Sequence, residues 1–225
     1  MARHLDLEEQ EQLDELKHFW NQWGNLITWL LIAVFGSFAA WNGWQYWQRS
    51  QAVKASVLYE EVERAAAGGD VGRVEQSLQD MRERFGGTAY AQQAGLLAAR
   101  VLQEKGKPDA ARAALEAVVA DASDDGYEAV ARLRLAALLV EAGKHEDALK
   151  QLSGELPGEF AGLAADRRGD ILQLQGKKDA AKAEYTRAWQ AFGPETEYRA
   201  LVEVKLTSLG VDVQALKAPA ESAKS

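Results

Sequence analysis

One stretch without a charged side chain, residues 24–44, constrains this chain more than any other feature of its sequence. At about 1.5 Å per residue, a helix over these residues covers the roughly 30 Å hydrocarbon core of a bilayer. A buried helix of a soluble protein rarely stays apolar on every side for such a length. The sequence therefore predicts a transmembrane helix over residues 24–47.

Aromatic residues flank the predicted span, as is typical of segments that lie where lipid meets water. The residues predicted to anchor the helix at these interfaces are Trp20, Trp23, Trp41, Trp44, Tyr46 and Trp47. Small residues within the span are spaced so that a second helix can approach closely. The predicted helix-packing residues are Gly36, Ala40 and Gly43.

The segment before the span, residues 1–23, is acidic. A cleaved signal peptide would be basic there and would end in small residues, whereas residues 45–51 are bulky and polar. We therefore expect an uncleaved anchor. Apolar residues recur at helical spacing from Leu13 onward, so the acidic segment forms either an amphipathic helix or a solvated tail. The few Lys and Arg residues beside the span do not decide its orientation.

The composition excludes several classes of function. The chain has no cysteine, which rules out disulfide bonds, thiolate catalysis and cysteine-ligated metals. Its net charge of −8 is spread along the whole length, whereas binding to nucleic acid requires a clustered basic patch. Because proline is rare and alanine and leucine are abundant, the chain beyond the span should be almost entirely helical.

Glycines punctuate the region after the span at intervals of 37, 37 and 33 residues, at Gly69, Gly106, Gly143 and Gly176. The clearest turns read GKPDAARAAL, GKHEDALKQL and GKKDAAKAEY, each with an alanine five positions after the glycine: Ala111, Ala148 and Ala181. Helix–turn–helix units with a period of about 34 residues are typical of tetratricopeptide repeats. The predicted fold is all-α, a transmembrane helix followed by a tetratricopeptide-repeat-like α-solenoid over residues 48–209.

Local signals place the remaining helix ends. The first helix of a degenerate opening unit, residues 52–67, follows the span with nothing between them that would break a helix. Asp125 and Glu128 form a capping-box pattern. Pro194 suits the first position of a final helix over residues 194–209. Residues 210–225 have little to bury and are predicted to be a disordered tail.

The first helix of each pair lines the concave face of a tetratricopeptide solenoid. Counting back from the turn glycines, the predicted partner-binding groove contains Gln93, Leu96, Arg100, Val130, Arg134, Glu141, Asp166 and Asp170. This mixture of apolar side chains and both charge signs suits a protein partner and not a single fixed ligand. The alternative is a face that is merely solvated or is filled by the final helix.

No constellation of residues points to catalysis. The three histidines, His4, His18 and His145, are far apart, and none belongs to a zinc motif. Asp166 and Asp170 share a helix face, and we expect a solvated or groove-lining charge cluster there, because an acid–base pair needs burial. The prediction is a protein that is not an enzyme, with no catalytic residue, metal site, cofactor or small-molecule substrate.

The segment EQLDELKHFWNQWGN, the single span and the segment GWQYWQ together resemble the ancillary subunit of the bacterial SecYEG translocon, over residues 8–50. The remainder resembles that family in architecture. The resemblance implies an inner-membrane protein with residues 1–23 in the cytoplasm and the repeat domain in the periplasm. It also implies two partners, the SecYEG translocon and a membrane-anchored parvulin-like chaperone. A third partner, membrane lipid, follows from the predicted span. The function implied is an adaptor that helps newly translocated proteins reach periplasmic chaperones.

A second class of function stays open. In that alternative, the chain is an envelope-stress regulator whose acidic cytoplasmic segment binds a signalling protein. The sequence leaves the client protein and the oligomeric state undecided.

Overall fold

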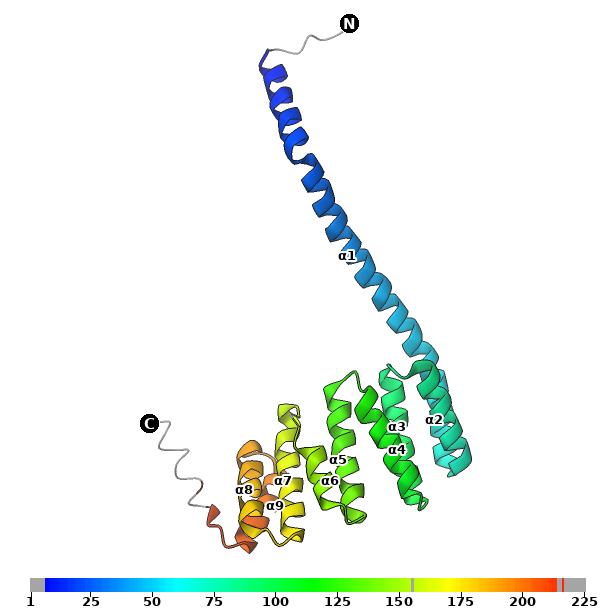
Figure 1. Cartoon of the computed structure of the whole chain (residues 1–225), viewed down its shortest axis with the longest axis vertical. Coiled ribbons are helices and arrows are strands. Elements are labelled where there is room, and N and C mark those ends of the chain that lie inside the picture. Colours follow the sequence, from blue (N-terminus) through cyan, green and yellow to red (C-terminus); the bar gives the residue numbers. More distant parts are fainter. Residues whose placement is uncertain (1–6, 155, 214–215, 217–225) are drawn as a thin grey trace. The chain divides into compact units, whose positions relative to one another are not determined.

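The structure is a computed structural model that describes residues 7–154, 156–213 and 216. The described residues form nine α-helices and no strand, so the predicted all-α class is confirmed (Figure 1). The helices are α1 (Leu7–Gly68), α2 (Val71–Phe85), α3 (Ala89–Glu104), α4 (Pro108–Asp121), α5 (Asp125–Glu141), α6 (His145–Leu152), α7 (Gly158–Leu174), α8 (Lys178–Ala191) and α9 (Glu197–Ser208). The chain divides into two compact units, Met1–Gln51 and Ala52–Ser225.

Helix α1 contains the predicted span and continues without a break into the first repeat. Within the described residues it is the one helix long and apolar enough to cross a membrane, and only 6% of its most apolar stretch is buried. A core helix of a soluble protein would be mostly buried. The acidic segment is helical from Leu7 onward, which matches the helical alternative for that part, whereas residues 1–6 lie outside the described residues.

The turn glycines adopt the left-handed backbone conformation that side chains with a Cβ disfavour. Their φ angles are 63° at Gly69, 71° at Gly106, 72° at Gly143 and 74° at Gly176. After each glycine the next amide bonds back five residues, as Lys107 N does to Leu102 O at 2.8 Å. This hydrogen bond closes the end of the helix and reverses the chain. A fifth such turn, at Gly210 with φ 80°, was not predicted.

The two helices of a repeat meet at the small residues that the sequence indicated. Ala111, Ala148 and Ala181 are each 0% exposed. Gly169 allows a second close approach, because a Cβ there would lie 2.5 Å from the ring of Tyr185.

Two clusters of buried residues form the core of the repeat unit. The first cluster runs from Ala55 on α1 to Leu152 on α6 and also takes in Ile171 of α7. The second cluster joins α7, α8 and α9 through Ala165, Ala181, Tyr185, Ala188, Trp189, Val202, Leu206 and Val213. Helix α7 therefore contributes to both clusters.

Two predicted helix ends need correction. The cap of α5 is Asp124, whose carboxylate accepts bonds from Gly126 N and Tyr127 N, and not Asp125. The chain turns after Phe192, so α9 begins at Glu197 and not at Pro194.

The tail predicted from residue 210 starts too early in the chain, because residues beyond that point are still packed. Val213 is only 8% exposed and belongs to the second cluster, and Val211 packs against that cluster. Apolar residues beyond Gly210 therefore contribute to the core. Residues 217–225, which the predicted tail includes, lie outside the described residues.

Candidate partner-binding surfaces

The first helices α3 and α5 bring together most of the predicted groove residues. Arg134 donates from Nη1 to the Leu96 carbonyl at 3.1 Å, and Gln93 donates to the hydroxyl of Tyr127. At the other end of these helices, Gln103 donates to both carboxylate oxygens of Glu141, at 3.0 and 3.2 Å. We call this surface the first-helix face, defined by Gln93, Arg100, Val130, Arg134 and Glu141.

These five residues differ in how far a partner can reach them. Arg100, Arg134 and Glu141 are exposed, while Gln93 and Val130 are half-buried. Arg100 has its guanidinium 3.8 Å from Glu104 in an exposed ion pair. Exposed pairs of this kind contribute little to stability, so the side chain remains available for an interaction.

Tyrosines that were not predicted from the sequence extend the first-helix face. The rings of Tyr59 on α1 and Tyr90 on α3 have centroids 5.8 Å apart, and Tyr127 accepts the bond from Gln93. Burial, and then the neighbouring Glu63, raise the pKa of Tyr59 above its ordinary value. Tyr90 and Tyr127 are separated by the same 37 residues as two of the turn glycines, so the repeat period contained the signal.

The expectation for Asp166 and Leu96 is wrong, because neither side chain is accessible. Asp166 is 0% exposed and Leu96 is 8% exposed. Helix α9 covers Asp166: Lys205 Nζ lies 2.7 Å from its Oδ1, and the hydroxyl of Tyr198 donates to its Oδ2 at 2.8 Å. The final helix fills this end of the predicted groove.

Asp170, which is half-buried, takes part in the same ionic network. Its Oδ1 accepts a bond from Lys205 at 2.6 Å and one from the Tyr185 hydroxyl at 2.8 Å, while Arg167 lies 3.3 Å from its Oδ2. The carboxylates therefore fasten α9 to α7, and of the two only Asp170 keeps contact with solvent, whereas a solvated or groove-lining charge cluster was expected. We call Asp166, Asp170, Tyr185, Tyr198 and Lys205 the α7–α9 network.

The tyrosines of this network are held in their neutral, donating form. Burial, followed by the hydrogen bond to Asp166, raises the pKa of Tyr198 to about 12. Burial and the bond to Asp170 likewise raise the pKa of Tyr185 well above its ordinary value. Groups held in one protonation state near neutral pH are suited to a structural role and not to proton transfer.

Metal ligation has no support in the part of the chain that the structure describes. There, no three His, Asp or Glu side chains are placed so that they could hold an ion. His145 is half-buried at the start of α6 and His18 is exposed, while His4 lies outside the described residues.

Comparisons with known proteins agree with this architecture. A family model described as a tetratricopeptide repeat-like domain matches residues 17–211. An ancillary SecYEG translocon subunit of Neisseria gonorrhoeae is 30% identical over 210 residues, covering 93% of this chain and 100% of that protein. The chain belongs to the ancillary SecYEG translocon subunit family. Relatives with the same description from Haemophilus influenzae and Escherichia coli are 28% and 29% identical, over 90% and 81% of this chain.

In this member of the ancillary SecYEG translocon subunit family, the candidate span carries the residues predicted to meet lipid. Every predicted interface anchor is exposed, from Trp23 at 46% to Tyr46 at 78%. A Cβ added at Gly36 or Gly43 would meet no other atom within 4 Å, so both positions present open backbone. Lipid contact and helix packing at these positions, Ala40 included, stay predictions.

Proposed function

We propose that this chain is a non-enzymatic accessory subunit of the SecYEG translocon, held in the bacterial inner membrane by α1. The observation that supports this most directly is the match to relatives described as ancillary SecYEG translocon subunits along almost the whole chain. A candidate span with almost no buried residues, joined to tetratricopeptide-like repeats, fits a membrane-anchored adaptor.

For orientation, we propose that residues 1–23 lie in the cytoplasm and that residues from about 48 onward lie in the periplasm. Protease added to spheroplasts should then digest the repeat unit and spare the N-terminus. Protection of the repeat unit together with loss of the N-terminus would contradict this orientation.

For the finer function, we propose that the first-helix face binds a membrane-anchored, parvulin-like periplasmic chaperone and so helps newly translocated proteins to reach it. The exposed arginines and half-buried tyrosines of this face are residue types that dominate binding energy at protein interfaces.

Crosslinking in intact cells tests the finer function. A photoreactive residue at position 100 should trap the chaperone, and Arg100→Glu should weaken its co-purification while leaving the melting temperature unchanged. Lys178→Glu, an equal charge reversal at an exposed position on α8, is the matched control. Equal capture by both variants would place the contact elsewhere.

The alternative function is a regulator that acts through its acidic segment, and it predicts that partner capture depends on that segment. Deletion of residues 1–19 should then abolish capture of a cytoplasmic partner. The proposed adaptor should still co-purify with the translocon and the chaperone after the same deletion.

A further inference from the structure

An open groove with a volume of about 490 Å³ lies between the second helices α2 and α4. Its residues are distinct from those of the first-helix face. Leu78, Leu102, Ala110 and Ala114 form its apolar floor, and Leu102 and Leu78 are only 1% and 7% exposed. Its remaining lining residues are Glu75, Gln79, Arg82, Glu83, Ala113 and Asp121.

The groove exists because α4 presents alanines where it faces α2. Ala110, Ala113 and Ala114 recur at helical spacing, and their single methyl groups leave open the space that leucines would fill. Helix α2 contributes lining residues over 75–83, about 12 Å of helix at 1.5 Å per residue. That length matches two turns of a docked helix.

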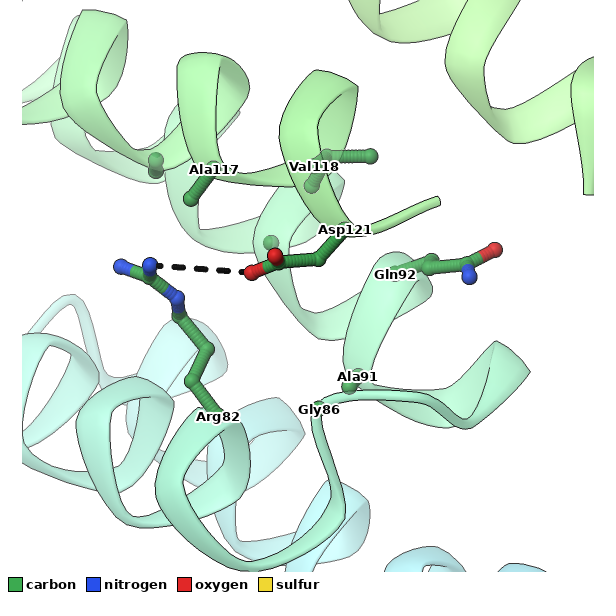
Figure 2. A pocket seen from close by; sticks show the side chains of 9 residues that line it. Arg82, Gly86, Ala91, Gln92, Ala117, Val118 and Asp121 are labelled. Carbon is green, nitrogen blue, oxygen red and sulfur yellow. Dashed lines mark ion pairs between the residues drawn. The ribbon is translucent and has the colours of Figure 1, made fainter. Parts of the chain in front are cut away.

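An ion pair closes one end of the groove. Figure 2 shows Arg82 from α2 and Asp121 from α4 pointing toward one another, with 3.9 Å between Nη2 and Oδ2. The pocket beside this pair has a volume of only about 10 Å³, room for at most one water molecule. A ligand of any size must therefore lie in the open part of the groove, toward Glu75.

The rim of that open part is acidic. Glu75 and Glu83 both line it, and within the described residues no ion pair includes either of them. The one arginine of the rim, Arg82, is already paired with Asp121. Gln79 donates to Glu83 at 2.8 Å, which fixes that carboxylate along α2. The uncompensated charge of the groove is therefore negative.

We propose that this groove docks a short amphipathic helix of a protein partner, with aliphatic side chains on the floor and lysine or arginine beside Glu75 and Glu83. An apolar floor with polar walls between two helices suits a helix that lays one apolar face into a groove. The carboxylates favour a basic partner and repel both an acidic segment and an anionic lipid surface. The proposal does not depend on the function assigned to the first-helix face.

Peptide binding to the full-length protein in zwitterionic nanodiscs tests this proposal. The probe is a fluorescent 14-residue helix of leucine and alanine with two lysines on its polar face, and its twin carries glutamates in place of the lysines. Only the lysine peptide should bind, and its affinity should fall as salt is raised.

Variants locate the site. Ala113→Trp should weaken binding at least tenfold by filling the groove, whereas Ala120→Trp, at an exposed position of the same helix outside the groove, should not. Glu75→Lys combined with Glu83→Lys should transfer the preference to the glutamate peptide. Melting temperatures verify that each variant is folded.

Several outcomes would overturn the proposal. They are equal loss of binding at positions 113 and 120, binding of neither peptide, equal binding of both peptides, and binding that appears only with anionic lipid in the nanodisc.

Discussion

Lys205 and Asp166 form an ion pair across 39 residues of sequence, with Nζ 2.7 Å from Oδ1, and the aspartate has no contact with solvent. A buried carboxylate is tolerated only when a counter-charge and hydrogen bonds replace its water. Here Lys205 supplies the counter-charge and Tyr198 supplies a hydrogen bond, and the two residues belong to α9. Removing α9 from α7 would therefore leave a buried charge without a partner.

Lys205→Met should destabilise the protein by about 3–5 kcal/mol, because it removes the counter-charge of a fully buried carboxylate. Urea unfolding of the full-length protein in detergent measures this change. Lys182→Met is the matched control: its exposed pair with Asp179, at 3.7 Å, should cost less than about 1 kcal/mol. Similar losses in the two variants would contradict the structural role of the α7–α9 network.

The stability of the protein should fall above about pH 10. Below that pH, Tyr198 keeps its proton in the folded and the unfolded state, so its contribution is fully present. Between about 10 and the folded pKa of about 12, the unfolded state releases the proton while the folded state keeps it, which favours unfolding. Tyr198→Phe should make this decline shallower, and unfolding curves at pH 8 to 11 test it. Parallel profiles for the two proteins would refute this linkage.

Ala181→Glu should destabilise the repeat unit by several kcal/mol, because the position is 0% exposed where α8 packs on α7. Ala183→Glu places the same side chain at an exposed position of the same helix and should change stability little. Thermal melts of both variants test the packing. An unchanged melting temperature for the first variant would mean that the pair of helices is packed differently.

Gly169→Ala should destabilise the protein although alanine favours a helix by about 1 kcal/mol over glycine. The new Cβ would lie 2.5 Å from the ring of Tyr185, and that tyrosine is only 1% exposed and cannot move aside. Gly72→Ala, also in a helix, would meet its nearest atom at 3.7 Å and should preserve or raise stability. The urea midpoint of Gly169→Ala should lie below that of Gly72→Ala, and the reverse order would contradict the prediction.

The repeat architecture could be predicted because its turns impose a backbone requirement that the sequence displays directly. A left-handed turn requires glycine at Gly106 and Gly143, and a close helix crossing requires a residue as small as Ala148. These requirements are local, so their spacing alone shows the period of the repeat. The residues between them only had to be compatible with a helix.

The α7–α9 network could not be predicted by the same reasoning. Asp166 lies ten residues before its turn glycine, as Leu96 does in an earlier repeat, and nothing local to it indicates that Lys205 lies against it. The groove between α2 and α4 escaped prediction for a related reason. Ala113 carries no signal by itself, since an alanine leaves a space only when the opposite helix fails to fill it.

The division of the core into two clusters has a consequence for synthesis. During synthesis from the N-terminus, residues 55–171 leave the ribosome before α8 and α9 have been made. Those residues contain every member of the first cluster. The first cluster can therefore close while the ribosome is still adding the second, as is general for domains that fold in order of synthesis. Until Lys205 emerges, Asp166 can remain hydrated at the growing edge, so its burial marks the packing of α9.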